Sequence, residues 1–274
     1  MSQNPFDPNF KDLPDILPIF PLDGVVLLPR GDLPLNVFEP RYMGMVDDVF
    51  KTNRMIGIVQ PMAELSVPQS ALRATITHER GQNPQLQDDA GALDTTDSPA
   101  MTNLMIDEHE PLYHIGCAGR ITHFAELEEG RYLITLRGIC RFRVREDEGE
   151  GATSPLKTAP LKEDTPYRLI QPDWSGFEDD LKKIECPPID RKQLCGLLQR
   201  YFAIHEITLD WSLLHNIEDD EMLMTALAMI CPFSSMEKQA LLESPCTTSR
   251  LSLLISLLEM SAYYTAQVSH IKRH

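Results

Sequence analysis

The sequence ILPIFPLDGVVLLPRGDLPLNVFEPRY, at residues 16–42, decides how this chain begins to fold. It contains three short apolar runs, which lie at residues 16–20, 25–28 and 34–38. Runs of four or five residues that are rich in Val, Ile, Leu and Phe are typical of strands and too short for helices. Asp23-Gly24 supplies a turn, and prolines at the ends of the runs restrict these strands to edges and bulges. The stretch therefore predicts an irregular β-barrel or a curled sheet.

The clearest alternation of apolar and polar residues lies at residues 131–145. Apolar side chains occupy alternate positions up to Val144, and the positions between them include four arginines from Arg137 onward. A period of two predicts a long strand with one buried face and one basic face. Because strands come before this point and helical spacing follows it, we expect an α+β fold.

The hydrophobic period changes to that of helices after residue 173. A first helix is predicted around Phe177 and Leu181, and a second is capped by Asp190 and carries an apolar stripe at residues 194–202. The other predicted helix starts are Asp219 or Asp220, Ser234 with Glu237 as a capping box, and Thr248 or Ser249. The second half of the chain is therefore predicted to be a helical bundle.

The chain divides into a flexible arm, a β-rich part and a helical part. Residues 1–12 are polar and lack periodicity, which is typical of a loose terminal arm. The β-rich part spans residues 13–170, and its acidic segment at 79–110 has too few aromatic and β-branched residues to order itself. The helical part spans residues 171–268.

Three motifs along the chain carry a family resemblance. LPIFPL, VLLP and LPLNVFEPRY lie within residues 17–42, GRYLITLRGICRFRV lies at 130–144, and EKQALLE lies at 237–243. In this order they resemble the start, the central hairpin and the closing helices of the N-terminal domain of the Lon protease family. The resemblance covers residues 13–262 and is greatest to free-standing bacterial proteins made of this domain alone. It implies a PUA-like, β-rich fold of the Lon N-terminal type, followed by a C-terminal helical bundle, in a domain that recognises substrates.

The charge of the chain limits its partners. Its 274 residues include 25 Lys and Arg against 41 Asp and Glu, which gives a net charge of −16. Nucleic acids and anionic membranes are bound by concentrated Lys and Arg, so neither is expected as a partner. The sequence also lacks a signal peptide, an apolar run of about 18 residues and cysteines with zinc-site spacing. We therefore expect a cytoplasmic protein with no membrane span and no cofactor.

Motifs for catalysis are scarce in this sequence. Ser235-Met236-Glu237-Lys238 has the SxxK spacing of penicillin-binding enzymes, but their SDN and KTG motifs are missing. His109-Glu110 and His205-Glu206 each supply only half of an HExxH zinc motif. A full-length Lon protease carries its ATPase and Ser/Lys protease in later domains, so the resemblance implies neither activity. We expect that Ser234 or Ser235 caps a helix, that Lys238 points into solvent, and that the chain is not an enzyme.

Two groups of residues are candidates for binding. One is a basic set that either receives carboxylates of a partner or forms an outer sheet face balanced by acidic residues. Its members are Arg120, Arg137, Arg141, Arg143 and Arg145. The other is Glu39-Pro40-Arg41-Tyr42, in which opposite charges on either side of a proline favour a structural corner at Glu39, Arg41 and Tyr42 over a ligand contact.

We therefore predict a non-catalytic recognition module that binds unfolded or partner polypeptides in protein quality control, with a Lon-type protease as a candidate partner. Two alternatives stay open. An RNA-binding PUA-like domain follows from the resembled fold, although the net charge opposes it. A Ser/Lys hydrolase would use Ser235 as the nucleophile and Lys238 as its activating base.

Overall fold

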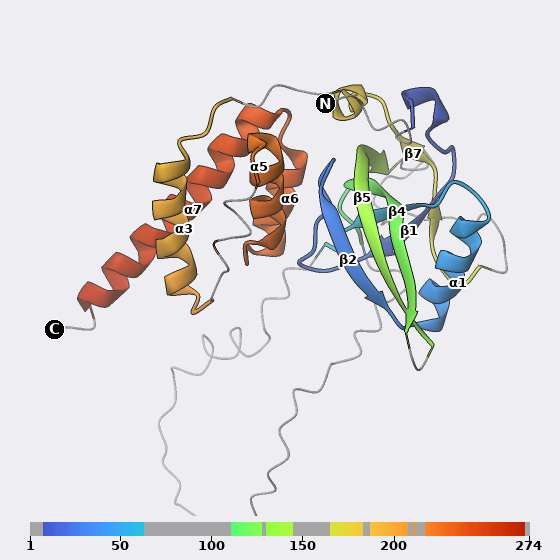
Figure 1. Ribbon diagram of the computed structural model, residues 1–274, viewed down its shortest axis with the longest axis horizontal. Helices are drawn as coiled ribbons and strands as arrows, with labels where there is room; N and C mark the ends of the chain where they lie inside the picture. Colours follow the sequence, from blue (N-terminus) through green and yellow to red (C-terminus); the bar gives the residue numbers. More distant parts are fainter. Residues whose placement is uncertain are drawn as a thin grey trace, which may run out of the picture.

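A computed structural model of the chain describes two halves, a sheet and a helical bundle, which lie side by side (Figure 1). The described residues are 8–62, 111–127, 130–144, 165–182, 187–207, 211 and 217–271, with the backbone alone at 262–271. The acidic segment predicted to be disordered, at 79–110, lies outside the described residues, as do the first seven residues of the arm.

The described strands form one mixed sheet. They are β1 (Leu17–Pro21), β2 (Asp32–Val37), β3 (Met55–Val59), β4 (Ile115–Leu127), β5 (Arg131–Val144), β6 (Leu169–Ile170) and β7 (Pro172–Asp173). The sheet order is β2-β5-β4-β3-β1-β6, and β7 pairs with the far end of β5. β1 and β3 are parallel, whereas the other pairs are antiparallel. Among the described strands, β2 and β6 are edges, so this is an open sheet rather than a closed barrel.

β4 and β5 form a long ribbon in which the side chains change faces halfway. Gly119 pairs with Gly138 and Ala118 pairs with Cys140, so Ile139 is an extra residue on β5. An extra residue reverses which positions face each side of a strand. The apolar residues of β5 that face the helices are Ile134 and Leu136, and those in the core on the other face are Cys140, Phe142 and Val144. The same reversal turns Arg141 toward the helical bundle.

The apolar run at residues 25–28 is buried but is not a strand, so this part of the prediction is wrong. Leu27 and Leu28 are fully buried and belong to the core that the sheet shares with the helices. The run crosses over β5 at Gly138, where an added Cβ atom would lie 2.0 Å from the carbonyl oxygen of Leu28. Because the run lies across the sheet and not beside a strand, its backbone cannot join a ladder.

Five described α-helices complete the fold. They are α1 (Pro40–Phe50), α3 (Arg191–Ile204), α5 (Asp220–Ile230), α6 (Ser235–Glu243) and α7 (Thr247–Ile271). α1 lies beside the sheet, and the other four form the bundle on its opposite side (Figure 1). Asp190 and Asp219 accept hydrogen bonds from the first backbone N–H groups of α3 and α5, and Ser234 with Glu237 forms the capping box of α6. Local sequence signals therefore located these three helix starts correctly.

The helix predicted around Phe177 and Leu181 is a short 3-10 helix, η2 (Glu178–Leu181), within the described residues. Gly176 precedes it with a φ of +85°, a left-handed conformation that interrupts an α-helix. The helical period that begins at Asp219 or Asp220 also predicts a buried Ile230, but Ile230 is 50% exposed. The buried face of α5 includes Leu223, Met224, Leu227 and Ala228.

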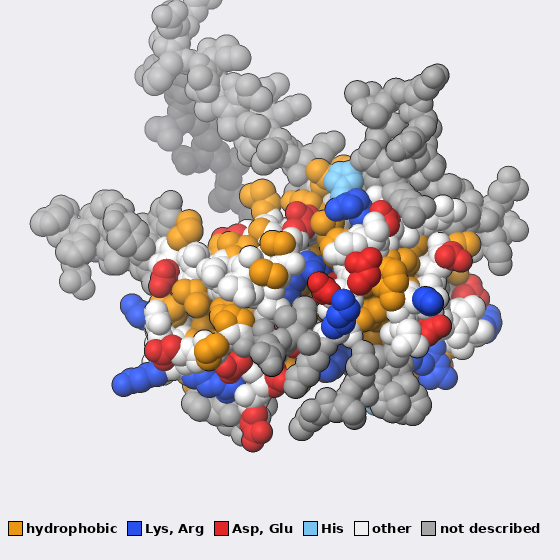
Figure 2. All heavy atoms as spheres, turned by 90° about the horizontal axis from the view of Figure 1, so that it is seen from above, with side chains coloured by type: hydrophobic (Ala, Val, Ile, Leu, Met, Phe, Trp, Pro, Cys, Tyr) orange, Lys and Arg blue, Asp and Glu red, His pale blue; other side chains and the backbone are white. Residues whose placement is uncertain are grey.

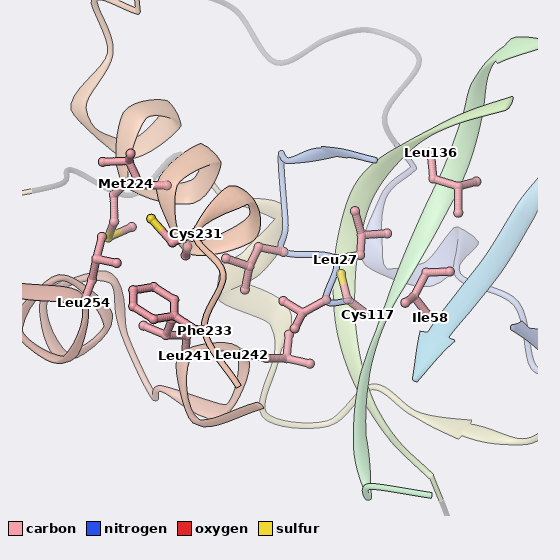
Figure 3. Packing of buried hydrophobic residues seen from close by; sticks show 14 of the residues in the cluster. Leu27, Ile58, Cys117, Leu136, Met224, Cys231, Phe233, Leu241, Leu242 and Leu254 are labelled. Atoms are coloured by element: carbon pink, nitrogen blue, oxygen red, sulfur yellow. The ribbon is translucent and has the colours of Figure 1, made fainter. Parts of the chain in front are cut away.

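One hydrophobic core connects the two halves of the molecule. It contains Leu27 and Cys117 from the sheet side together with Met224 and Leu242 from the bundle. Figure 3 shows Leu242 extending from α6 toward Cys117 and Leu27. Because burial of shared apolar surface is the main stabilising term in folding, we infer that the bundle and the sheet stabilise each other.

Candidate functional site

Arg141 is buried where the sheet meets the helices, with only 6% of its surface exposed. Its Nε and Nη2 groups donate to the two carboxylate oxygens of Asp180 at 2.9 and 2.8 Å. Its Nη1 group donates to the carbonyl oxygens of Leu242 and Ser244 at 3.1 and 2.7 Å. Burial lowers the pKa of Arg141, but the hydrogen bond and the negative charge of Asp180 together raise it, so the net change is upward. The guanidinium therefore clamps β5, η2 and the end of α6 together.

A second buried arginine lies close to this clamp. Arg250 is 6% exposed, and its Nε group donates to the carbonyl oxygen of Leu241 at 2.9 Å. Burial, with repulsion from Arg141, lowers the pKa of Arg250 to about 10. Arg30 forms an ion pair with Glu221 across the same boundary. We call Arg30, Arg141, Asp180, Glu221 and Arg250 the seam network.

The predicted arginine set does not form one basic surface. Arg141 belongs to the seam network, so the expectation of one buried and one basic face on β5 is wrong at this position. Arg137 forms an ion pair with Asp32 at 2.7 Å, Arg120 is half-buried, and Arg143 is exposed. Arg145 lies outside the described residues. Figure 2 shows basic and acidic side chains intermixed on the face seen from above.

Glu39, Arg41 and Tyr42 lie at the corner between β2 and α1. The carboxylate of Glu39 accepts a hydrogen bond from the Nε group of Arg41 at 2.9 Å. The Arg41 guanidinium lies 4.6 Å from the centre of the Tyr42 ring, which stacks on Phe20 at 4.0 Å. Burial raises the pKa of the Tyr42 hydroxyl. These contacts fix the angle at which α1 leaves the sheet.

Ser235 and Lys238 attach α6 to the turn at Asp23-Gly24. The Ser235 hydroxyl donates to Oδ1 of Asp23 at 2.7 Å, and the Lys238 amine donates to the carbonyl oxygen of Gly24 at 2.9 Å. Lys238 is 8% exposed, so the expectation that it points into solvent is wrong. Burial lowers its pKa. Both side chains are thus bound to the turn between β1 and β2, and Ser234 is the residue that caps the helix.

Exposed apolar side chains gather at the end of the ribbon formed by β2, β4 and β5. Phe124 is 40% exposed, and its ring lies 5.0 Å from that of Phe50 in α1 and 5.1 Å from that of Tyr132. Leu127, 36% exposed, ends β4, and Phe38, 50% exposed, follows the β2 residue that pairs with Tyr132. The strand register places Phe124 and Tyr132 on the face next to Phe50 of α1, whereas Leu127 and Phe38 point to the other face. We call Phe38, Phe50, Phe124, Leu127 and Tyr132, which surround this end of the ribbon on its two faces, the ribbon-tip patch.

The ribbon-tip patch has little signature in the sequence. Strand β3 pairs with β4 only as far as Arg120, so the last part of the ribbon extends beyond the cover of β3. That length depends on how the strands pair, which a single strand's pattern does not specify. The nearest signal is an aromatic residue, Phe124, at an alternating position close to the turn that follows Leu127.

The described part of the chain contains no group of three or more His, Cys, Asp or Glu residues that could hold a metal ion. His205 and Glu206 are exposed at the end of α3, where Glu206 has a φ of +55°. His109-Glu110 lies outside the described residues. No described helix combines the length and the hydropathy that a membrane span requires.

Comparison with known sequences assigns the family. The profile of the ATP-dependent protease La (LON) substrate-binding domain matches residues 16–260. The chain therefore belongs to this family, which confirms the family resemblance of the three sequence motifs. Membership supports a role in substrate recognition, and the family's description is that of a binding domain.

The curated relatives are longer than this chain. It is 24% identical over 250 residues to Lon protease 2 of Myxococcus xanthus, in an alignment that covers 91% of this chain and 24% of the relative. It is 22% identical over 264 residues to a Lon protease of Cytophaga hutchinsonii, with 96% and 26% covered. The chain thus spans about a quarter of the length of these relatives.

Two solved structures are similar to this one. A Lon N-terminal domain protein from Xanthomonas campestris shares 20% identity with a TM-score of 0.45, and the match covers 88% of this chain and 97% of that one. The N-terminal domain of a Mycobacterium avium complex Lon protease shares 15% identity with a TM-score of 0.43, with 89% and 98% covered.

Proposed function

We propose that this chain binds unfolded or partner polypeptides through the ribbon-tip patch. The observation that carries the proposal is the exposure of Phe38, Phe124 and Leu127 at one end of the sheet. Clustered exposed apolar side chains are characteristic of binding surfaces, and aromatic residues dominate the energy of such contacts. Proline at position 34 removes a backbone donor from the edge strand β2. Recognition by side chains of the patch therefore suits this edge better than addition of a peptide strand.

The test measures binding of a reduced and alkylated unfolded protein, and of short apolar peptides, by fluorescence anisotropy with the whole chain. Phe124→Ser should weaken binding roughly tenfold, because an aromatic anchor contributes at least 1–2 kcal/mol to an interface. Ile230→Ser is the matched control, since Ile230 is 50% exposed on α5, away from the patch. Absence of binding by the unaltered chain, or equal binding by Phe124→Ser, would disprove the proposal.

We propose further that the chain performs no covalent chemistry with Ser235 and Lys238. Both side chains are engaged in hydrogen bonds that hold a turn, because Ser235 donates to Asp23 and Lys238 donates to Gly24. A serine-reactive probe should therefore leave the folded protein unlabelled. Labelling that disappears in Ser235→Ala would contradict this.

The physiological role that follows is capture of polypeptides for quality control in the cytoplasm, alone or with a Lon-type protease. We also propose that the exposed Arg143 and the half-buried Arg120 and Arg137 assist by receiving carboxylates of the partner. The arm at 1–12, the β-rich part at 13–170 and the helical part at 171–268 would be its structural units. Crosslinking in intact cells, followed by identification of the partners, tests this role. Recovery of nucleic acid or membrane components in place of polypeptides would count against it.

A further inference from the structure

The ribbon-tip patch is bordered by two carboxylates that form no ion pair of their own among the described residues. Asp47 of α1 and Glu126 of β4 both lie beside Tyr132, and Glu126 is its direct cross-strand neighbour. Both carboxylates are exposed, and neither takes part in an ion pair within the described part of the chain. By contrast, Asp48 on the same helix binds Lys51 at 2.9 Å. The patch is therefore apolar at its centre and acidic at its border.

The local field at this border is negative. The pKa of the Tyr132 hydroxyl is raised by burial, then by the charge of Asp47 and its hydrogen bond, and then by the charge of Glu126. Three cations lie in the neighbourhood. They are Lys51, which binds Asp48 and also interacts with the charge of Asp47, Arg54, which covers Phe50, and Arg131, which is half-buried and has contacts of its own. None of the three offsets the two carboxylates at the hydroxyl. The field at Tyr132 therefore attracts a positive charge.

The rings of the patch are also suited to a cation. The Arg54 guanidinium lies 5.5 Å from the centre of the Phe50 ring, so one ring of the cluster already holds a cation from this chain. Among the described residues, no cation lies over Phe124 or Tyr132. The faces of aromatic rings attract Lys and Arg, and a nearby carboxylate adds a charge-assisted hydrogen bond.

We infer that the ribbon-tip patch selects apolar polypeptide segments that are flanked by Lys or Arg. The apolar side chains of the segment would pack on Phe50 and Phe124, and its cation would lie between Asp47 and Glu126 against the Tyr132 ring. This inference rests on the proposed function and adds a preference that the family's description does not contain. It also gives the acidic charge of the chain a local role, because acidic segments would be repelled from the same place.

The experiment compares three peptides that have the same apolar centre and carry Lys, Gln or Glu flanks. Binding to the whole chain is measured by fluorescence anisotropy at low and high salt. The Lys-flanked peptide should bind roughly five to ten times more tightly than the Gln-flanked one at low salt, and this ratio should fall as salt is added. The Glu-flanked peptide should bind most weakly.

The double variant Asp47→Asn with Glu126→Gln should reduce that ratio to about one to two, while binding of the Gln-flanked peptide stays unchanged. Asparagine at position 47 still accepts the hydrogen bond from Tyr132, so the fold is preserved. Glu218→Gln with Glu259→Gln removes the same charge from exposed positions on the bundle and should keep the full ratio.

The outcomes separate this inference from the proposed function. Equal binding of the three peptides, with Phe124→Ser still weakening all of them, would overturn the charge preference and leave polypeptide recognition in place. A Lys preference that persists in the double variant would assign it to the net charge of the chain, and would also overturn the inference. Failure of every peptide to bind would overturn the proposed function itself.

Discussion

The seam network and the ribbon-tip patch use similar side chains in opposite ways. At the seam, Arg141 and Asp180 are buried and fully engaged with each other. At the tip, Asp47 and Phe124 are exposed and retain surface that no described residue covers. Charged groups that are buried and paired maintain a fold, whereas exposed apolar and charged groups remain available to a partner. Residue type alone therefore does not indicate whether an arginine or a carboxylate binds a ligand.

The largest effect is expected from the seam. Arg141→Ala would leave the Asp180 carboxylate buried without its partner, together with the carbonyl groups of Leu242 and Ser244. Removing one partner of a buried ion pair typically costs about 3–5 kcal/mol of unfolding free energy. Unfolding in urea, followed by circular dichroism, measures this change. Arg143→Ala is the matched control on the same strand, and its exposed side chain should contribute less than about 0.5 kcal/mol.

If the two variants are equally stable, Arg141 behaves like a surface residue and the proposed difference between the seam and the tip is wrong. If Arg141→Ala loses unfolding free energy but still binds peptides under conditions where it is folded, the difference is supported. The seam would then support the fold without taking part in recognition.

A smaller effect is expected at the start of α6, which belongs to the seam side of the molecule. Ser234→Ala removes the capping box with Glu237 and should lower the unfolding free energy by about 1 kcal/mol. Ser252→Ala, at an exposed position within α7, should change it by only a few tenths of a kcal/mol. If both changes have the same effect, the cap does not contribute to the docking of α6 against the sheet.

Local signals in the sequence were sufficient for the elements whose cause is local. The caps at Asp190 and Ser234 follow from hydrogen bonds within three residues, and the stripe at 194–202 follows from the helical period. The long β5 strand follows from alternation in the same way. These features would be recognisable in a peptide of about 15 residues.

The features that were missed depend on distant residues. Arg141 is buried because of the bulge at Ile139, which shifts the register against β4, and because Asp180 lies 39 residues later in the chain. Lys238 is buried because its amine reaches Gly24, 214 residues away. The run at 25–28 is continuously apolar, so its pattern does not show that it crosses the sheet. It can cross only because Gly138, on β5, has no Cβ atom at the crossing point. None of these contacts has a local signature.

The burial of Lys238 predicts a pH dependence that is smaller still. Its pKa is lowered in the folded protein, so between that lowered value and the ordinary 10.5 the unfolded chain binds more protons at this site. The free energy of unfolding contributed by Lys238 therefore rises with pH in this window. From pH 8 to pH 10, the wild type should therefore gain stability relative to Lys238→Met.

Chemical denaturation at the two pH values measures this difference, with Lys192→Met at an exposed position of α3 as the control. The difference in unfolding free energy between the wild type and Lys192→Met should be the same at both pH values. A wild type that loses stability relative to Lys238→Met as the pH rises would contradict the burial of this amine.

The smallest effect on stability is expected at the tip. A comparison of a tip variant with a core variant therefore distinguishes the binding region from the folding core most clearly. Leu127→Ser removes an exposed apolar side chain at the end of β4, so the unfolding free energy should change by less than about 0.5 kcal/mol while binding of apolar peptides weakens severalfold. Leu254→Ser in the shared core should behave in the opposite way, because a fully buried leucine costs several kcal/mol when a polar group replaces it. If Leu127→Ser instead lowers stability by more than about 2 kcal/mol, the tip is a part of the folding core. The exposed side chains there would then need an explanation other than recognition.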